Sequence, residues 1–310
     1  MKNKYIYIVF CLMVFLKLHG DIQDHLKTAE NKLDMHQMPN IDFIYMINLD
    51  QRPEKFAKSI EQLAPYGVYP YRFSAVNGWE LTLQAINDVG VKFRSWMPRD
   101  LMATTYLLDG QGEPYHEIMH NPERSYFCHC LARGTVGIYL SHLSVLQDAY
   151  NSGYETIWVM EDDIYVCKNP NKISDTIARL DRLKGKGGWD ILFTDRDIRD
   201  KNGKYTPCTG YARRPNFTPD NYARAAKNKK IDRDLRLIGS RYGAHSMIVR
   251  RSGMKKILDF AYKHNIYLPY DMEWQNIPNL EMFTVLDDIV TNLHDALSDN
   301  GAPFYKQKEN

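Results

Sequence analysis

Three consecutive carboxylates, Glu161, Asp162 and Asp163, directly follow the apolar run from Thr156 to Met160. Adjacent carboxylates repel one another, so a compensating positive charge is expected beside them. Their hard oxygen ligands favour Mg²⁺ or Mn²⁺, which take one or two carboxylates and leave the other positions to phosphate oxygens and water. Taken alone, however, three such residues are more typical of a solvated acidic turn after a strand.

Two other apolar runs also end in polar side chains. The run that begins at Phe43 ends in Asn48-Leu49-Asp50, and the run that begins at Asp190 ends in Asp195. In open α/β sheets, ligands bind beyond the carboxyl ends of the strands. If these runs are neighbouring strands, their polar ends form one ligand site.

The elements that must position these residues alternate along the chain. Continuous apolar runs predict strands over 43–50, 69–73, 156–163 and 190–195, and helical spacing predicts helices over 53–63, 134–152 and 170–183. A strand over 243–249 and a helix beginning at Ser252 follow. Such alternation predicts an α/β fold with a mainly parallel central sheet flanked by helices. Residues 79–133 are expected to be an insertion or lid, and 196–241 to be loop-like.

Length and charge limit the function classes. The chain has 310 residues and 44% hydrophobic content, enough for one large core, and its 40 basic against 38 acidic residues provide no general attraction to nucleic acid. Lys2 and Lys4 precede an apolar run that ends at Leu16, which is typical of a secretory signal; an uncleaved anchor with membrane association is the alternative. The expected division is signal or anchor 1–20, polar linker 21–40, domain 41–300 and tail 301–310.

Beyond Cys11 in the apolar N-terminal run, four cysteines remain: Cys128, Cys130, Cys167 and Cys208. This even number permits two disulfides in an exported chain. Cys128-His129-Cys130 lacks a second Cys/His pair at zinc-ligand spacing, so a disulfide partner and a buried thiol are favoured over a metal site.

Five motifs share an order and rough spacing with those of a known family. They are Ile47-Asn48-Leu49-Asp50-Gln51-Arg52-Pro53, Ala75-Val76-Asn77-Gly78, Gly134-Thr135-Val136-Gly137 leading to Leu140-Ser141-His142, Met160-Glu161-Asp162-Asp163-Ile164, and Trp189-Asp190-Ile191-Leu192. The pattern resembles glycosyltransferase family 25, which includes bacterial lipooligosaccharide galactosyltransferases and collagen galactosyltransferases. Gly243-Ala244-His245-Ser246 and Leu268-Pro269-Tyr270-Asp271 resemble weaker landmarks of the same family.

The resemblance implies a GT-A-type nucleotide-sugar-binding fold, a UDP-sugar donor and Mn²⁺, or Mg²⁺, at the acidic motif. Asp163 would be the principal metal ligand, and Glu161 would act directly or through water. The residues assigned to the nucleotide-sugar are Asn48, Asp50, Arg52, Asn77 and Asp162. The alternatives are that Arg52 is a surface cation and that Asp50 only caps the following helix.

Three further features have two interpretations each. Asp271 could be the general base that deprotonates an acceptor hydroxyl, or it could accept backbone hydrogen bonds in a turn. His142 could contact the donor phosphate, but a buried, hydrogen-bonded histidine is at least as compatible with its helical face. Asp287, Asp288 and His294 could contribute another metal ligand or base, by analogy with other GT-A enzymes alone.

The resemblance thus implies an inverting hexosyltransferase, with galactose as the expected sugar. Its acceptor would be a hydroxyl on a glycan, a lipid-linked saccharide or a protein, as in lipopolysaccharide biosynthesis. Its expected location is the periplasm, a lumen or the outside of the cell, or a membrane surface. A carbohydrate- or nucleotide-sugar-binding protein without catalysis is the alternative. A two-carboxylate glycosidase is less favoured because it needs no nucleotide.

Overall fold

The computed structural model describes residues 20–208, 211–220 and 222–309. The segment predicted to be a signal or anchor therefore lies, apart from Gly20, outside the described residues. Among the helices of the described ranges, none has the length and apolar character needed to cross a membrane.

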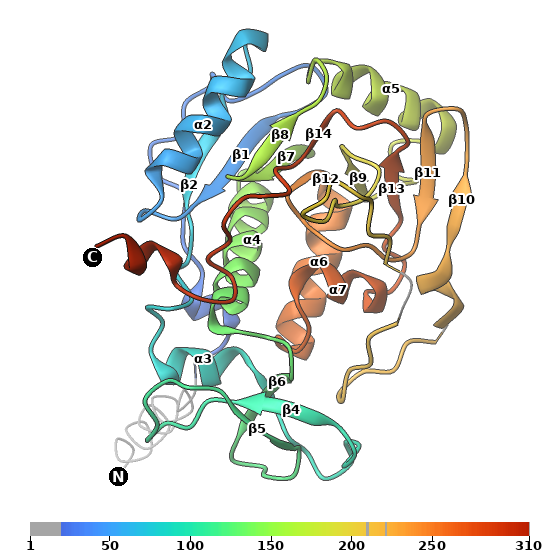
Figure 1. Ribbon diagram of the computed structural model, residues 1–310. Helices are drawn as coiled ribbons and strands as arrows, with labels where there is room; N and C mark the ends of the chain where they lie inside the picture. The colour runs from blue at the N-terminus through green and yellow to red at the C-terminus, as the bar shows by residue number, and fades with distance from the viewer. Residues whose placement is uncertain (1–19, 209–210, 221, 310) are drawn as a thin grey trace, which may run out of the picture.

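A large twisted sheet forms the centre of the molecule (Figure 1). In the described part of the chain it has eight strands, in the spatial order β10 (Asn228–Lys230), β11 (Leu235–Ile238), β13 (Met282–Val285), β9 (Ile191–Phe193), β12 (Ser246–Arg250), β7 (Thr156–Glu161), β1 (Phe43–Asn48) and β2 (Tyr71–Ser74). Strands β1 and β7 are buried along almost their whole length, as continuous apolar runs require when both faces of a sheet are covered.

The sheet is mixed, so the prediction of a mainly parallel sheet is wrong. Strand β1 pairs parallel with β2 and β7, and β13 pairs parallel with β9. Strand β12 instead runs antiparallel to both β7 and β9, and β10–β11–β13 are antiparallel neighbours. The reason lies in the long connection between β9 and β12, whose described residues form β10 and β11 and no α-helix. A parallel return is normally made through a crossover helix, and without one the chain re-enters the sheet in the opposite direction.

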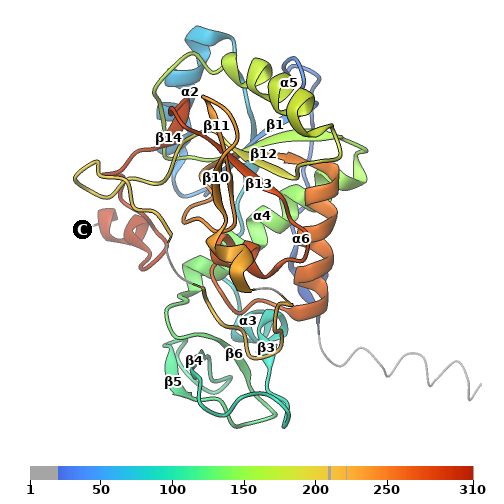
Figure 2. The same ribbon diagram turned by 90° about the vertical axis from the view of Figure 1, so that its right-hand side faces the viewer.

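Among the described residues, two helices pack on each face of the sheet. One face carries α4 (Arg133–Asn151) and α6 (Arg251–His264), and the other carries α2 (Pro53–Leu63) and α5 (Lys172–Lys184) (Figures 1 and 2). The predictions of these four helices are confirmed to within two residues at each N-terminal end. Side chains along β1 alternate between the two cores, with Tyr45 and Ile47 facing α4, and Ile44 and Met46 facing the opposite layer.

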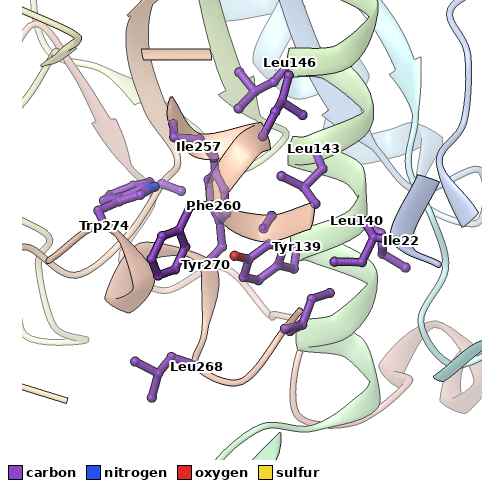
Figure 3. Packing of buried hydrophobic residues seen from close by; sticks show 14 of the residues in the cluster. Ile22, Tyr139, Leu140, Leu143, Leu146, Ile257, Phe260, Leu268, Tyr270 and Trp274 are labelled. Atoms are coloured by element: carbon purple, nitrogen blue, oxygen red, sulfur yellow. The ribbon is translucent and has the colours of Figure 1, made fainter. Parts of the chain in front are cut away.

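The core beneath α4 extends to α6 and the short helix α7 (Tyr270–Glu273). Figure 3 shows Tyr139 and Leu143 of α4 directed toward Phe260 of α6 and Tyr270 of α7. The rings of Tyr139 and Tyr270 meet edge to face, with centroids 5.2 Å apart. This packing fixes the segment that carries Asp271 against the helix that carries His142.

The region expected to be an insertion or lid forms a small subdomain below the main sheet (Figure 1). It contains α3 (Leu83–Val89) and a second sheet in the order β3 (Val91–Lys92), β6 (Ser125–Cys128), β4 (Met102–Thr105) and β5 (Tyr115–Ile118). The chain passes from β6 into α4 over the four residues 129–132. The subdomain is thus attached directly to the N-terminus of the central helix.

The segments at both ends of the described chain pack on the domain. Ile22, within the 3₁₀ helix η1 (Ile22–His25), is 2% exposed and belongs to the core beneath α4. At the other end, β14 (Val290–Asn292) pairs antiparallel with β8 (Ile164–Val166). The chain then runs down beside α4 to the 3₁₀ helix η5 (Phe304–Glu309), drawn in red in Figure 1.

Candidate nucleotide-sugar site

The polar ends of β1 and β7 meet, as the sequence predicts. The two strands are parallel neighbours with Ile47 opposite Glu161, so Asn48 and Asp162 follow at the same edge of the sheet. The Asn48 side chain donates from Nδ2 to Asp162 Oδ2 at 2.6 Å. It also accepts from Arg72 Nε at 2.7 Å and is 1% exposed. Asn48 is thus a buried polar link that orients the carboxylate of Asp162.

An open pocket of about 640 Å³ lies against this edge. The three carboxylates of the acidic motif line it together with five other segments: the end of β1, the start of α2, residues 75–79, the first half of α4 and residues 298–300. Apolar side chains including Ile47, Val76 and Ile138 line the pocket together with charged groups. A concave site with apolar walls and a few convergent polar groups is typical of a small-molecule site.

The three carboxylates have different environments. Glu161 Oε1 lies 3.0 Å from Nε2 of His142, and this contact keeps the pKa of Glu161 below its usual range, although burial opposes the shift. Burial, reinforced by the charge of Asp163, raises the pKa of Asp162 to about 7. Burial and the charge of Glu161 raise the pKa of Asp163. Burial and mutual repulsion together give these carboxyls a strong demand for a positive partner.

Asp163 has an unsatisfied carboxylate oxygen. Its Oδ1 is buried and has no hydrogen-bond partner among the described residues. Its backbone carbonyl accepts from the N–H of Leu293 at 2.7 Å, which fixes the backbone at this point. A buried carboxylate oxygen without a partner is costly, and a bound cation or a ligand hydrogen bond would compensate it.

Lys55 brings a positive charge to the pocket and was not predicted. It lies in the first turn of α2 and lines the pocket. Its charge adds to the lowering of the pKa of Glu161 and opposes the rise in the pKa of Asp162 and Asp163. Its position three residues after Arg52 places both cations on one side of a helix start, a spacing that is visible in the sequence. Arg52 is 3% exposed and is a pocket residue, so the surface-cation alternative is wrong.

The C-terminal segment closes one side of the pocket. Asp299 is 2.7 Å from Nε of Arg52, and its backbone carbonyl accepts from the indole N–H of Trp79 at 2.7 Å. Asn77, a predicted nucleotide residue, lines the pocket and donates to the hydroxyl of Tyr305 at 2.9 Å. No local pattern in the sequence indicates that residues 298–305 reach a site formed by residues 47–163.

Two predicted strand-end carboxylates do not join this pocket. Asp50 is exposed at the surface, where it accepts from Arg72 at 2.8 Å and from Ser74 at 2.7 Å. Asp195 is completely buried and is surrounded by Arg241, His245 and Thr291. β12 lies between β9 and β7, so the end of β9 is displaced from the end of β7.

His142 is buried, at 1% exposure, and stacks on Tyr270 with ring centroids 4.5 Å apart. It lines the pocket and contacts Glu161, so the interpretation as a buried, hydrogen-bonded histidine holds. Its Nδ1 has no partner among the described residues.

The three candidates near the end of the sequence, Asp287, Asp288 and His294, do not line the pocket. Asp287 is exposed beside Lys168, and buried Asp288 accepts from Arg199 and Tyr205. His294 is exposed, one residue after Leu293.

Asp271 lies on α7 and is not a lining residue of this pocket. Its Oδ2 accepts from the N–H of Gly243 at 2.6 Å, and its Oδ1 accepts from the N–H of Met272 at 2.9 Å. Burial raises its pKa, and the charge of Glu161 adds to this effect. Both oxygens therefore accept backbone hydrogen bonds, as the second interpretation of Asp271, a role in a turn, predicts. A raised pKa is also a property that a general base requires.

Glycines allow the pocket walls to approach each other. A Cβ on Gly137 of α4 would lie 2.4 Å from the backbone nitrogen of Gly78 and 2.6 Å from the carbonyl oxygen of Val76. A Cβ on Gly78 would lie 1.9 Å from the carbonyl oxygen of Arg133. The two motifs that contain these glycines are therefore in backbone-to-backbone contact, which only glycine permits.

The fold is that of an α/β protein with a pocket at the carboxyl edge of a mixed sheet, and comparison with known proteins identifies the family. The model of glycosyltransferase family 25 (LPS biosynthesis protein) matches residues 41–274. The chain belongs to glycosyltransferase family 25.

Curated relatives agree with this assignment. A glycosyltransferase 25 family member of Aedes aegypti is 28% identical over 184 residues, which cover 57% of this chain and 25% of that protein. One of Drosophila melanogaster is 24% identical over 173 residues, 56% of this chain and 24% of that protein. An inactive glycosyltransferase 25 family member 3 of Homo sapiens is 26% identical over 160 residues, 50% of this chain and 22% of that protein. The matched region thus spans about a quarter of the length of these relatives.

Proposed function

We propose that this protein is a metal-dependent glycosyltransferase that moves a hexose, galactose by the family resemblance, from UDP to an acceptor hydroxyl. The single observation that carries the proposal is the buried, unpartnered Oδ1 of Asp163 within the pocket at the β1–β7 edge. Family membership adds a nucleotide-sugar as the donor class. The acceptor is a glycan, a lipid-linked saccharide or a protein side chain.

The residues present fit a divalent cation of the Mg²⁺ or Mn²⁺ type. Asp163 would be its principal ligand and Glu161 the second, directly or through water. In the described ranges, no group of three or more His, Cys, Asp or Glu side chains is arranged to hold a metal. Such cations commonly take only one or two carboxylates and complete their shell with phosphate oxygens and water. When bound, the ion would neutralise charge that builds up on the departing nucleoside diphosphate.

The side chains around the motif have separate roles in this proposal. His142 holds Glu161, and Asn48 holds Asp162, so both carboxylates are oriented before the donor enters. Lys55 and Arg52 offer positive charge to the diphosphate, and the apolar wall near Trp79 accepts the uracil ring. Preorganised groups of this kind avoid a reorganisation cost during the reaction.

For the acceptor, Asp271 is proposed as the general base. It would take the proton of the acceptor hydroxyl while that oxygen attacks the anomeric carbon from the face opposite UDP. The bond from the anomeric carbon to the UDP oxygen breaks in the same step, so the configuration inverts. The raised pKa of Asp271 supports this role.

A second candidate, a protein of the same fold that binds a nucleotide-sugar or carbohydrate without catalysis, is favoured by one observation. Both carboxylate oxygens of Asp271 already accept backbone hydrogen bonds. Binding of a UDP-sugar without transfer or hydrolysis across an acceptor panel would establish this alternative. Location in the periplasm, a lumen, the extracellular space or at a membrane is proposed from the N-terminal sequence alone.

The test is a donor screen by isothermal titration calorimetry with and without Mn²⁺. We expect UDP-sugar binding that strengthens with Mn²⁺ and is lost in Asp163→Ala. The control is Asp175→Ala, because Asp175 is an exposed carboxylate in the first turn of α5 and does not line the pocket. Full transfer activity in a folded Asp163→Ala variant would disprove the assignment.

A further inference from the structure

Cys128 and Cys130 lie together in a tight turn outside the nucleotide-sugar pocket. Cys128 is the last residue of β6, and the N–H of Leu131 donates to its carbonyl at 3.0 Å, which closes a turn over residues 128–131. Within this turn the two Sγ atoms are 3.1 Å apart. A disulfide bond is about 2 Å long, so a movement of about 1 Å would join them.

The two thiols differ in exposure and acidity. Cys128 is 6% exposed, whereas Cys130 is exposed to solvent. The Cys128 thiol hydrogen-bonds to the Cys130 sulfur and thereby lowers the pKa of Cys130 to about 6, and His129 adds to this effect. The same hydrogen bond, together with burial, raises the pKa of Cys128. One sulfur is therefore an accessible thiolate near neutral pH, and the other is a protected thiol beside it.

We propose that Cys128 and Cys130 are a redox-active dithiol that undergoes thiol–disulfide exchange with a low-molecular-weight disulfide of the glutathione type. The Cys130 thiolate attacks one sulfur of that disulfide, the S–S bond breaks, and the first small thiol leaves after taking a proton. Cys128 then loses its proton and attacks Cys130 Sγ, which releases the second small thiol. Two protein thiols are oxidised and one external disulfide is reduced, so atoms and electrons balance.

Cys167 differs from Cys130 in the acidity of its thiol. Cys167 is also exposed, but partial burial of its sulfur atom raises the pKa of its thiol to about 11. It is therefore an exposed cysteine without an activated thiolate. The dithiol also lacks the companions of a metal centre, because no metal-holding group of His, Cys, Asp or Glu occurs in the described ranges.

The pair occupies a junction in the fold. The N–H of Cys128 donates to the carbonyl of Tyr267 at 2.8 Å, four residues before Asp271. The turn leads into α4, whose first residues line the nucleotide-sugar pocket. A disulfide here would close a small ring within residues 128–130 and would stiffen the turn that connects the small sheet to α4. The proposed redox chemistry goes beyond the transfer reaction and does not depend on it.

The experiment uses the full chain, first reduced and then equilibrated with oxidised glutathione at neutral pH. Trypsin cleaves after Arg124 and Arg133, so peptide 125–133 contains both cysteines and no other. We expect this peptide to be lighter by two hydrogen atoms and to resist alkylation, and to take two alkyl groups after reduction. A peptide that keeps two free thiols in the oxidising buffer, or one that is cross-linked to Cys208 or Cys167, overturns the proposal.

Three single variants test the order of attack. Cys128→Ser should leave Cys130 trapped as a mixed disulfide with glutathione, and Cys130→Ser should form neither adduct nor internal disulfide. Cys167→Ser is the control and should behave like the parent protein. Cys130 should react with a thiol reagent at pH 7 at least about tenfold faster than Cys167.

Because Cys128 is buried, its variant is first checked by circular dichroism. If Cys128→Ser is unfolded, the exposed Cys130→Ser variant and the relative labelling rates of the parent protein still decide the proposal. Equal rates at Cys130 and Cys167 would contradict it.

Discussion

The side-chain amide of Asn48 donates to the carboxylate of Asp162 across the β1–β7 edge, with Nδ2 and Oδ2 2.6 Å apart. These residues are 114 positions apart in the chain, and the parallel register of the two strands brings them together. The contact connects two family motifs, one containing Asn48-Leu49-Asp50 and the other containing Glu161-Asp162-Asp163. It also occupies one oxygen of Asp162, whereas Oδ1 of Asp163 remains without a partner among the described residues.

Replacement of Asn48 by alanine should weaken donor binding about tenfold, because Asp162 then loses the group that orients it. The free energy of unfolding should also fall by about 1–3 kcal/mol, since Arg72 loses a buried acceptor. Calorimetry with UDP and Mn²⁺, together with urea unfolding, measures both effects. Asn202→Ala, in an exposed turn, is the control. Unchanged affinity in a folded Asn48→Ala protein would show that Asp162 does not depend on this contact.

Replacement of His142 by alanine should reduce Mn²⁺ affinity by about ten- to a hundredfold, as is typical when a group that orients a metal ligand is removed. Glu161 would lose the hydrogen bond that lowers its pKa. Titration of Mn²⁺ followed by electron paramagnetic resonance gives the affinity. His120→Ala is matched in residue type but lies on the exposed surface of the subdomain. A variant that retains both its fold and its Mn²⁺ affinity would remove His142 from the proposed site.

Replacement of Gly134 by alanine should displace the C-terminal segment from the pocket. A Cβ at this position would lie 2.3 Å from the carbonyl oxygen of Asn300, which is backbone and cannot rotate away. We expect weaker UDP-sugar binding and faster proteolysis after residue 297. In the control Gly187→Ala, a Cβ meets no atom within 4 Å, so the change should be neutral. Equal protease resistance of the Gly134→Ala and parent proteins would show that the segment does not depend on this contact.

The buried carboxylate of Asp195 should make stability dependent on acid pH. Arg241 and His245 outweigh the effect of burial and lower the pKa of Asp195 from 3.8 to about 2. A lowered folded-state pKa stabilises the protein above pH 3.8, and this contribution of about 2 kcal/mol is lost as the pH falls toward 2.

Urea unfolding at pH 6 and pH 3 measures that contribution. Asp195→Asn should be less stable than the parent protein at pH 6 by several kcal/mol, because Arg241 then remains buried without its counter-charge. The difference between variant and parent should shrink at pH 3. A difference that is the same at both pH values would contradict the assigned ionisation of Asp195.

Local sequence patterns were sufficient to predict two kinds of element: strands that are buried on both faces of the sheet, and helices that bury one face against a core. Apolar runs gave β1 and β7, and helical spacing gave α2, α4, α5 and α6, because burial of a whole strand or one helix face leaves a periodic trace. The ordered motifs also identified the acidic cluster and its family. Gly78 and Gly137 were visible as motif residues, but their mutual contact was not.

Only the tertiary structure decided which polar residues meet. The antiparallel insertion of β12 separates Asp195 from the pocket, and the outward turn after Asn48 leaves Asp50 at the surface. Asp299 comes to the site through the return of the C-terminal segment along α4, and its carbonyl there accepts from the indole N–H of Trp79. These positions depend on contacts between residues far apart in sequence, and such contacts leave no periodic signal in either partner. The same long-range packing gives each of the three adjacent carboxylates its own partner, or, for Oδ1 of Asp163, none within the described chain.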